Sequence, residues 1–398
     1  MKIFDYCSKI YNLCLNSSKT GNLIETNSIF EKKDLMFLRN YNSENISTEI
    51  VPNYHLADGI QLFFNYGSNL LNMDIIDIVN YFFYVILILT FGNLSFFIYK
   101  SELKNKFLLI LTTVIFYLFN IYFYNYSAEY LIYFFGSIIP LIFLIKLDSK
   151  SNSINLIYLF SYSFLAIIIF GMMRYYSYLS FFLITIILVF ILKKTLLKKI
   201  AFLVSIIGLI FLKFIIFNNI EEVRKENIKI VNPNFNYEKS VPGNNFYTSF
   251  YPGLGFLSNQ YVIGGFLDTA SYNKKLLPKN YNPKYGFYSI TDSHANNIKN
   301  EVWNIIINHP FFVIKTIFAK VGILIFYLLI ICNFFLINFF LNRKISKITK
   351  YSLLINMGVF AIFPIISIPS ILYTSGFFGS CFCILIISLG NFNFKIKN

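Results

Sequence analysis

Long apolar stretches recur along most of this chain, and the short loops that join them alternate between lysine-rich and lysine-free. A stretch of about 20 apolar residues is long enough to cross the hydrocarbon core of a bilayer. Loops rich in Lys and Arg stay in the cytoplasm, because positive charge resists translocation. Only 13% of the residues are charged, whereas a soluble domain has about 25%. The sequence therefore predicts an all-α polytopic membrane protein.

We expect about nine transmembrane helices, and the ends of each carry an error of a few residues. They fall at residues 76–98, 107–124, 127–145, 154–173, 176–192, 200–217, 322–341, 351–368 and 370–389. The short loops expected inside hold fifteen basic residues, and those expected outside hold one, Arg174. This arrangement puts the N-terminal segment outside and the C-terminus in the cytoplasm, and we expect a bacterial inner or plasma membrane.

The chain accordingly divides into four parts. An outer N-terminal segment with a surface helix spans residues 1–75, and a six-span bundle follows at 76–217. A large outer loop, which ends in a surface helix at 309–321, spans 218–321, and a three-span part ends the chain at 322–398. Seventeen of the 19 acidic residues and all three histidines fall on the predicted outer side. Any chemistry is therefore expected there.

The polar N-terminal segment has no evident means of crossing the membrane, because residues 1–16 lack the apolar core of a signal peptide. We expect the native reading frame to begin earlier, with one more span before Met1. If the segment is outside, Cys7 and Cys14 could form a disulfide. The net charge of +15 is explained by the inner loops and an anionic lipid surface, and it does not indicate a nucleic-acid partner.

Three charged residues near the outer ends of spans are the first site candidates. Arg174 is one of four arginines and lies at the membrane rim, where a guanidinium suits a phosphate and where an interfacial anchor would look the same. Glu129 is the only charge in its short outer turn, and it could contact a sugar hydroxyl, a cation or Arg174, or simply be solvated. Asp58, beside His55, could act as a general base or cap a helix.

The large outer loop holds weaker candidates. Asp268 and His294 are titratable groups without a complete nucleophile constellation around them. Lys315 and Lys320 could bind a lipid phosphate, although lysines that snorkel to the interface give the same pattern. The sequence contains no P-loop, no H-E-x-x-H and no paired C-x-x-C motif, so ATP hydrolysis and zinc proteolysis have no support. No metal ligand set is predicted.

Four stretches of the chain resemble the GT-C superfamily of integral-membrane glycosyltransferases, of the protein-mannosyltransferase and aminoarabinose-transferase type. Residues 54–64, which lead into 71–74, are similar to the first outer loop with its surface helix, and residues 127–131 to the second outer turn. Residues 171–174, followed by a span and two lysines, resemble the Gly-x-x-Arg element. Residues 301–310, followed by 311–320, resemble the return of the late loop to the membrane.

This resemblance implies a transferase that moves a sugar from a polyprenyl-phosphate donor to an acceptor on the outer face, in cell-envelope polysaccharide biosynthesis. A carboxylate would deprotonate the acceptor hydroxyl, and Arg174, Lys315 or Lys320 would stabilise the leaving phosphate. The catalytic Asp of the family follows a first span that is absent here, and by spacing Glu25 or Asp34 would occupy that region. No cofactor is certain, a divalent cation stays open, and the oligomeric state is unknown.

Three alternatives remain at this point. An O-antigen polymerase or ligase also uses a lipid-linked sugar and a large late loop, but it is expected to carry more arginines there than Arg224 alone. A transporter or flippase commonly has broken spans and charges near the midplane, and Lys213 is the main charge within these spans. An inactive, truncated relative of the transferase is the third alternative.

Overall fold

The computed structural model describes most of the helical part of the chain. The described residues are 38–43, 46–52, 62–63, 67–73, 78, 81–82, 85–86, 88–123, 128–148, 155–174, 176–192, 194–231, 233, 246–262, 276, 292–369 and 373–392. They are largely helical, in agreement with the predicted fold class. The antiparallel hairpin of β1 (Leu38–Ser43) and β2 (Ile46–Pro52) was not predicted.

Two helices form the centre of a bundle. α8 (Ala128–Asp148) packs along α18 (Ser375–Gly390), and both are buried on nearly every side along their described lengths. A helix that is apolar all round belongs in a core. The close approach of α18 to α8 depends on Gly379 of α18, because a Cβ at this position would lie 2.0 Å from Oγ of Ser137 on α8. The helices α6 (Asn93–Lys100), α7 (Lys106–Phe123), α11 (Leu179–Ile191) and α17 (Lys347–Ile366) pack around this pair.

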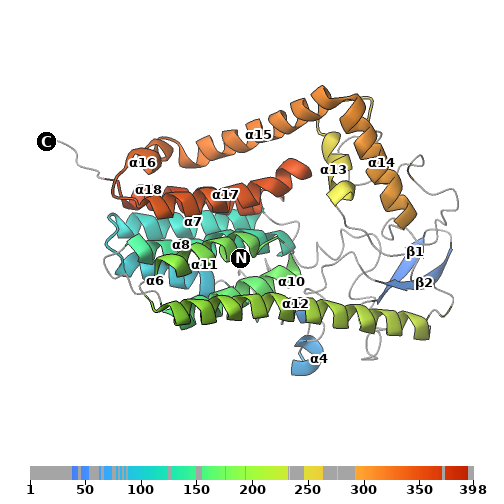
Figure 1. The fold of residues 1–398 in the computed structure, drawn as a ribbon, viewed down its shortest axis with the longest axis horizontal. Coiled ribbons are helices and arrows are strands. Elements are labelled where there is room, and N and C mark those ends of the chain that lie inside the picture. The colour runs from blue at the N-terminus through green and yellow to red at the C-terminus, as the bar shows by residue number, and fades with distance from the viewer. Residues whose placement is uncertain are drawn as a thin grey trace.

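The remaining helices complete the bundle. One continuous rod consists of α9 (Leu156–Phe164), η3 (Leu165–Phe170) and α10 (Gly171–Met173), and its middle part, η3, is a π-helix. A second π-helix, η2 (Ile88–Gly92), comes directly before α6. α12 (Leu196–Val231) has 36 residues, about 54 Å of helix. It therefore runs the length of the bundle and continues past one end (Figure 1).

Several of these helices are able to cross a membrane. Among the described residues, four are long and apolar enough by length and composition: Leu156–Met173, Leu196–Ile230, Pro310–Cys332 and Lys347–Ile366. Four more apolar helices are shorter: Lys106–Leu118, Ile132–Leu147, Leu179–Ile191 and Ser375–Gly390. Each of them overlaps a segment that the hydropathy pattern predicts as a span, but Leu196–Ile230 extends well past residues 200–217 and Pro310–Cys332 shares only residues 322–332 with the predicted span 322–341.

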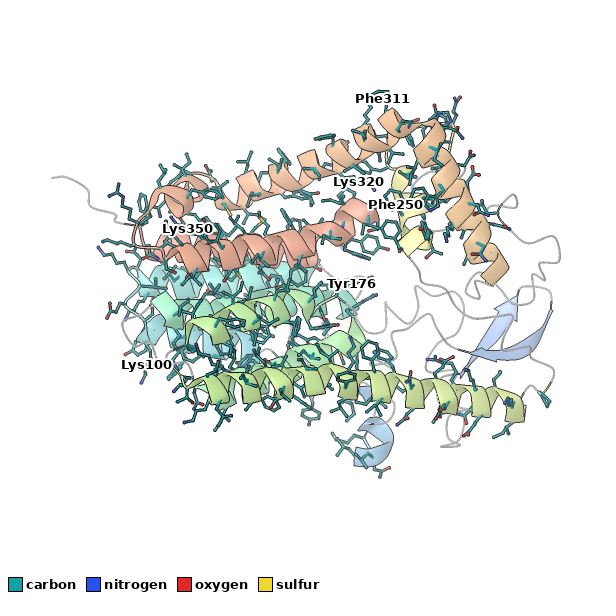
Figure 2. All side chains as sticks on the ribbon, in the orientation of Figure 1. Lys100, Tyr176, Phe250, Phe311, Lys320 and Lys350 are labelled. Carbon is teal, nitrogen blue, oxygen red and sulfur yellow. The ribbon has the colours of Figure 1, made fainter. Side chains whose placement is uncertain are left out.

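Lysine-rich loops that are far apart in the sequence meet at one end of the bundle. The N–H of Lys104 donates to Gly390 O at 2.8 Å, and Asn342 Nδ2 donates to Asn391 O at 3.0 Å. Lys350 Nζ donates to Phe340 O at 2.7 Å. Figure 2 shows Lys100 and Lys350 at this end, away from Tyr176 and Lys320. We call it the lysine-rich end.

The polar part of the protein lies beyond the opposite end (Figure 1). There α13 (Phe246–Leu254) and α14 (Asp292–Asn308) pack on each other and enclose a second apolar core, which includes Phe250, Ile298 and Val302. The hairpin packs against the part of α12 that extends past the bundle. The structure thus separates a lysine-rich end from an end that carries the polar segments.

The seventh predicted span differs from the structure at both of its ends. The sequence suggests a surface helix at 309–321 and a separate span at 322–341, whereas α15 is one helix over Pro310–Cys332. The break comes at Asn333, which has a φ of 46°, a conformation that Asn tolerates better than most residues. The Asn333 side chain accepts the N–H of Phe334 at 2.7 Å, and α16 (Phe335–Leu341) follows.

Candidate functional site

Arg174 ends the α9–α10 rod at the end opposite the lysine-rich one. Its backbone leaves the helix (φ −148°, ψ 116°), although its N–H still donates to Phe170 O at 2.7 Å. Its carbonyl oxygen accepts from the Ser177 N–H at 3.1 Å and from Ser177 Oγ at 2.7 Å. The half-buried arginine therefore sits on a turn that its own carbonyl closes, and the three residues of α10 separate it from the π-helix η3. Single π-helical turns are frequent at functional sites.

This turn packs onto α8 at Gly136. A Cβ on Gly136 would lie 2.5 Å from the Ser177 carbonyl oxygen, so the two backbones touch. Glu129 precedes Gly136 by seven residues, which is about 10 Å of helix and close to two full turns. Glu129 therefore lies on the same helix, nearer the start of α8. The predicted partners Glu129 and Arg174 come from two segments that meet.

A lysine within α12 also reaches this turn. Lys213 Nζ lies 4.2 Å from the ring centroid of Tyr178 and 5.6 Å from that of Phe217, and the side chain is 6% exposed. Gly171 makes room for it, because a Cβ there would lie 2.8 Å from Tyr178 Cδ1 and 3.2 Å from Lys213 Nζ. Gly171 thus leaves room chiefly for the ring of Tyr178, with Lys213 Nζ beside it.

Tyrosines gather at the same level of the bundle. Tyr133 of α8 lies one helical turn from Gly136 and packs on Phe363 of α17, with ring centroids 5.9 Å apart. Phe363 in turn contacts Tyr373, with centroids 5.1 Å apart. Tyr176, in the turn after Arg174, is 57% exposed. Of these tyrosines, Tyr133 is buried and Tyr176 is exposed at this end of the bundle.

Lys320 lies next to the end of α17. Its ammonium donates to the carbonyl oxygens of Ile365 (3.0 Å), Ile366 (3.4 Å) and Ser367 (2.5 Å), and the side chain is 1% exposed. These three contacts match the three N–H groups of an ammonium and the negative end of a helix dipole. The geometry gives Lys320 the role of capping α17. Phosphate binding by Lys320 stays a prediction.

The other predicted site residues are placed as follows. Lys315 is exposed on α15, about 140° around the helix from Lys320. His294 is buried in the first turn of α14, within the polar part of the protein. Four candidates lie outside the described residues: Glu25, His55, Asp58 and Asp268. In the described part of the chain, no group of three His, Cys, Asp or Glu side chains is arranged to hold a metal ion.

Sequence reasoning gave Lys213 no role in the site. The signal was present, because an ionisable residue inside an apolar span is a functional candidate by default. Its contact with Tyr178, in the turn after Arg174, was not visible, because that contact depends on how α12 packs against the α9–α10 rod. The aromatic contacts of Tyr133 were hidden for the same reason.

Comparison with known proteins adds no relative: no family, no curated protein and no solved structure matches this chain.

Proposed function

We propose that this protein is an integral-membrane glycosyltransferase of the GT-C type, which moves a sugar from a polyprenyl-phosphate donor to an acceptor on the outer face of the membrane. The observation that carries the proposal is the meeting of the Arg174 turn with α8, the helix whose first turn contains Glu129, through Gly136 and Ser177. This pairs a phosphate-binding group with a carboxylate-bearing helix start at the end where the polar segments lie.

The proposal includes the nine-span topology, with the lysine-rich end in the cytoplasm. The gathering of the lysine-rich loops supports this orientation, because positive loops remain inside. Lys213 follows Leu196 by 17 residues, about 26 Å along α12. With Leu196 at the inner edge of a hydrocarbon core of about 30 Å, this length supports a position of the Lys213 Cα near the outer rim, where the phosphate of an outer-leaflet lipid would lie.

In the proposed reaction, Arg174 stabilises the negative charge that grows on the leaving phosphate, because guanidinium forms paired hydrogen bonds with phosphate oxygens. Asp58 or Glu129 acts as the general base that deprotonates the acceptor hydroxyl. The hydroxyl oxygen attacks the anomeric carbon, the bond to the phosphate oxygen breaks, and the polyprenyl phosphate leaves. Exposed aromatic rings such as Tyr176 stack on the sugar.

The test is sugar transfer by protein in proteoliposomes, from radiolabelled polyprenyl-phosphate sugars to membranes of the source cell. Arg174→Ala and Asp58→Asn should each abolish transfer while protein yield stays unchanged. Lys344→Ala, an exposed lysine at the opposite end, serves as the matched control and should transfer like wild type. Wild-type turnover by both site variants would refute the assignment.

A flippase for the same lipid-linked sugar is the second candidate, and one observation favours it. Asn333 separates α15, which is long enough to span a membrane, from the short apolar helix α16, and interrupted apolar helices are common in transporters. The same proteoliposomes separate the two functions. A flippase would move the labelled lipid between leaflets and leave the sugar on its phosphate, whereas the transferase would release polyprenyl phosphate.

A further inference from the structure

The chain contains one tryptophan, Trp303, and it lies on the surface of α14. Its side chain is 46% exposed, and its indole N–H donates to the hydroxyl oxygen of Tyr247 at 3.3 Å. Ile307, four residues later, is 70% exposed, and Phe311, at the start of α15, is 85% exposed. Neighbouring apolar side chains that are exposed in this way mark an interaction surface.

The exposed apolar row continues along α15. Ile314, Phe318 and Ile325 are exposed, and they follow Phe311 at intervals of three, four and seven residues, which is the spacing of one helical face. α15 is long and apolar enough to cross a membrane, and in a bilayer this exposed face lies against lipid. The row on α14 therefore extends a lipid-facing surface past the end of the span.

The lengths of the two helices put Trp303 near the level of the lipid headgroups. Phe311 and Cys332 are 21 residues apart on α15, which is about 31 Å of helix and matches the thickness of a hydrocarbon core. Trp303 comes eight residues before Phe311, about 12 Å further along the chain. Because α14 turns away from the axis of α15 (Figure 1), its rise above the core is smaller, and the headgroup layer is about 5–8 Å thick on each side.

The exposed surface of α14 also has a polar row. Asn300, Asn304 and Asn308 are exposed at intervals of four residues, beside the row of Trp303 and Ile307. Asn308 Nδ2 donates to Asn304 Oδ1 at 2.5 Å. A helix with an apolar row beside a polar one is suited to the plane of a membrane interface.

A lysine flanks the apolar row on each side. Lys299 precedes Trp303 by one turn, and its ammonium lies 6.0 Å from the ring centroid of Tyr247. Lys315, exposed on α15, follows Phe311 by one turn. Lysine side chains lay their methylene groups along apolar surface and keep the ammonium in the polar layer, where lipid phosphates are negative. These charges complement a lipid surface.

We propose that Trp303, Ile307 and Phe311 form a lipid-contact surface, which seats α14 in the headgroup layer of the membrane beside α15. The indole ring suits this layer, because tryptophan has an apolar body and one polar N–H and is enriched at membrane interfaces. The asparagine row of α14 faces water. This contact holds the polar part of the protein at the membrane surface and does not depend on the transfer reaction.

The test uses tryptophan fluorescence, which reports a single position because the chain has one tryptophan. The full-length protein is placed in nanodiscs of phosphatidylcholine and phosphatidylglycerol, so that buffer reaches both faces of the bilayer. Lipids with bromine near the headgroup end of their acyl chains should remove most of the Trp303 emission, and lipids with bromine near the methyl end should remove less. Iodide in the buffer should remove little. Trp303→Phe gives the background from tyrosine.

Two double variants move the single tryptophan and serve as matched controls. Trp303→Phe with Asn300→Trp places it in the polar row of the same helix, where iodide should quench it and brominated lipids should not. Trp303→Phe with Phe318→Trp places it on the exposed face of α15, where bromine near the methyl end should quench it more strongly than it quenches Trp303.

Quenching of Trp303 by iodide as strong as that of the Asn300→Trp variant, with no effect of brominated lipid, would place it in water and overturn the lipid contact. Protection from both quenchers would mean that protein covers the row, for example a second copy, and would overturn it too. Lipid quenching in a protein that transfers no sugar keeps this inference and counts against the transferase alone. Sugar transfer by a protein whose Trp303 is quenched only by iodide refutes this inference alone.

Discussion

The ammonium of Lys320 donates a 2.5 Å hydrogen bond to the carbonyl oxygen of Ser367, the residue that follows the last turn of α17. Gly253 of α13 lies against the same place, because a Cβ there would be 2.2 Å from Ile366 O and 2.9 Å from Lys320 Nζ. One buried charge therefore joins α15, α17 and α13. It fixes α13 of the polar part of the protein against the bundle.

Replacing Lys320 with Met should destabilise the protein by about 3 kcal/mol, because it leaves buried carbonyl oxygens at the end of α17 without a charged donor. The measurement is the free energy of unfolding by denaturant in detergent micelles. Lys315→Met is the control, since that lysine is exposed on the same helix, and its effect should stay within about 0.5 kcal/mol. Equal effects of the two changes would contradict a capping role for Lys320.

Glycine substitutions should fall into two classes according to what a Cβ would meet. Gly253→Ala forces a Cβ against backbone carbonyl oxygens that cannot turn away, and such overpacking costs about 1–3 kcal/mol. Gly322→Ala, on α15, meets open space and should be neutral or slightly stabilising, since Ala favours helix over Gly. Thermal unfolding of the two variants in one detergent compares them. A Gly253→Ala variant as stable as Gly322→Ala would contradict the close contact.

Much of the bundle could be predicted because its signal is local. Hydropathy locates the apolar helices, and the alternation of lysines shows which loops share an end, since both follow from the preference of each residue for lipid or water. The positions at which the helices break were harder to predict from the sequence. Asn333 interrupts an apolar run without any change in hydropathy, so the pattern predicted one span across it.

The candidate site could be predicted from the sequence only in part. Arg174 stands out in the sequence because it is a rare arginine at the rim of a span. The roles of Lys213 and Lys320 depend on contacts between distant segments, and a sequence without an alignment does not contain that information. Lys320 shows the consequence, because a lysine near a membrane surface suggests phosphate binding, whereas its geometry is that of a helix cap.

The proposed orientation predicts which residues a membrane-impermeant maleimide reaches in intact cells. Asn300→Cys, exposed on α14, should be labelled, and Lys344→Cys, exposed at the lysine-rich end, should be protected until the cells are permeabilised. Both variants are made with Cys7 and Cys14 replaced by Ser. Cys332, Cys381 and Cys383 stay, since they are fully buried. Labelling of Lys344→Cys alone in intact cells would reverse the topology and remove the basis of the proposed function.

A buried polar contact inside the bundle should couple three helices. Ser180 of α11 donates to Asn356 Oδ1 of α17, and Asn356 Nδ2 donates to Ser137 O of α8 at 2.8 Å. Hydrogen bonds between helices in a membrane average about 0.6 kcal/mol and reach about 1.7 kcal/mol. A double-mutant cycle with Ser180→Ala and Asn356→Ala should therefore give a coupling free energy of about 1 kcal/mol.

The cycle is measured by unfolding in detergent, and its control combines Asn356→Ala with Ser205→Ala. Ser205 is exposed on α12 and bonds within its own helix, to Ala201 O at 2.9 Å, so that pair should show no coupling. Asn356→Ala alone should cost more than Ser180→Ala, because it also leaves the carbonyl oxygen of Ser137 without this donor. A coupling below the experimental error would mean that α11 and α17 are held together by apolar packing alone. The position of Arg174, just before α11, would then depend on the contact between Gly136 and Ser177.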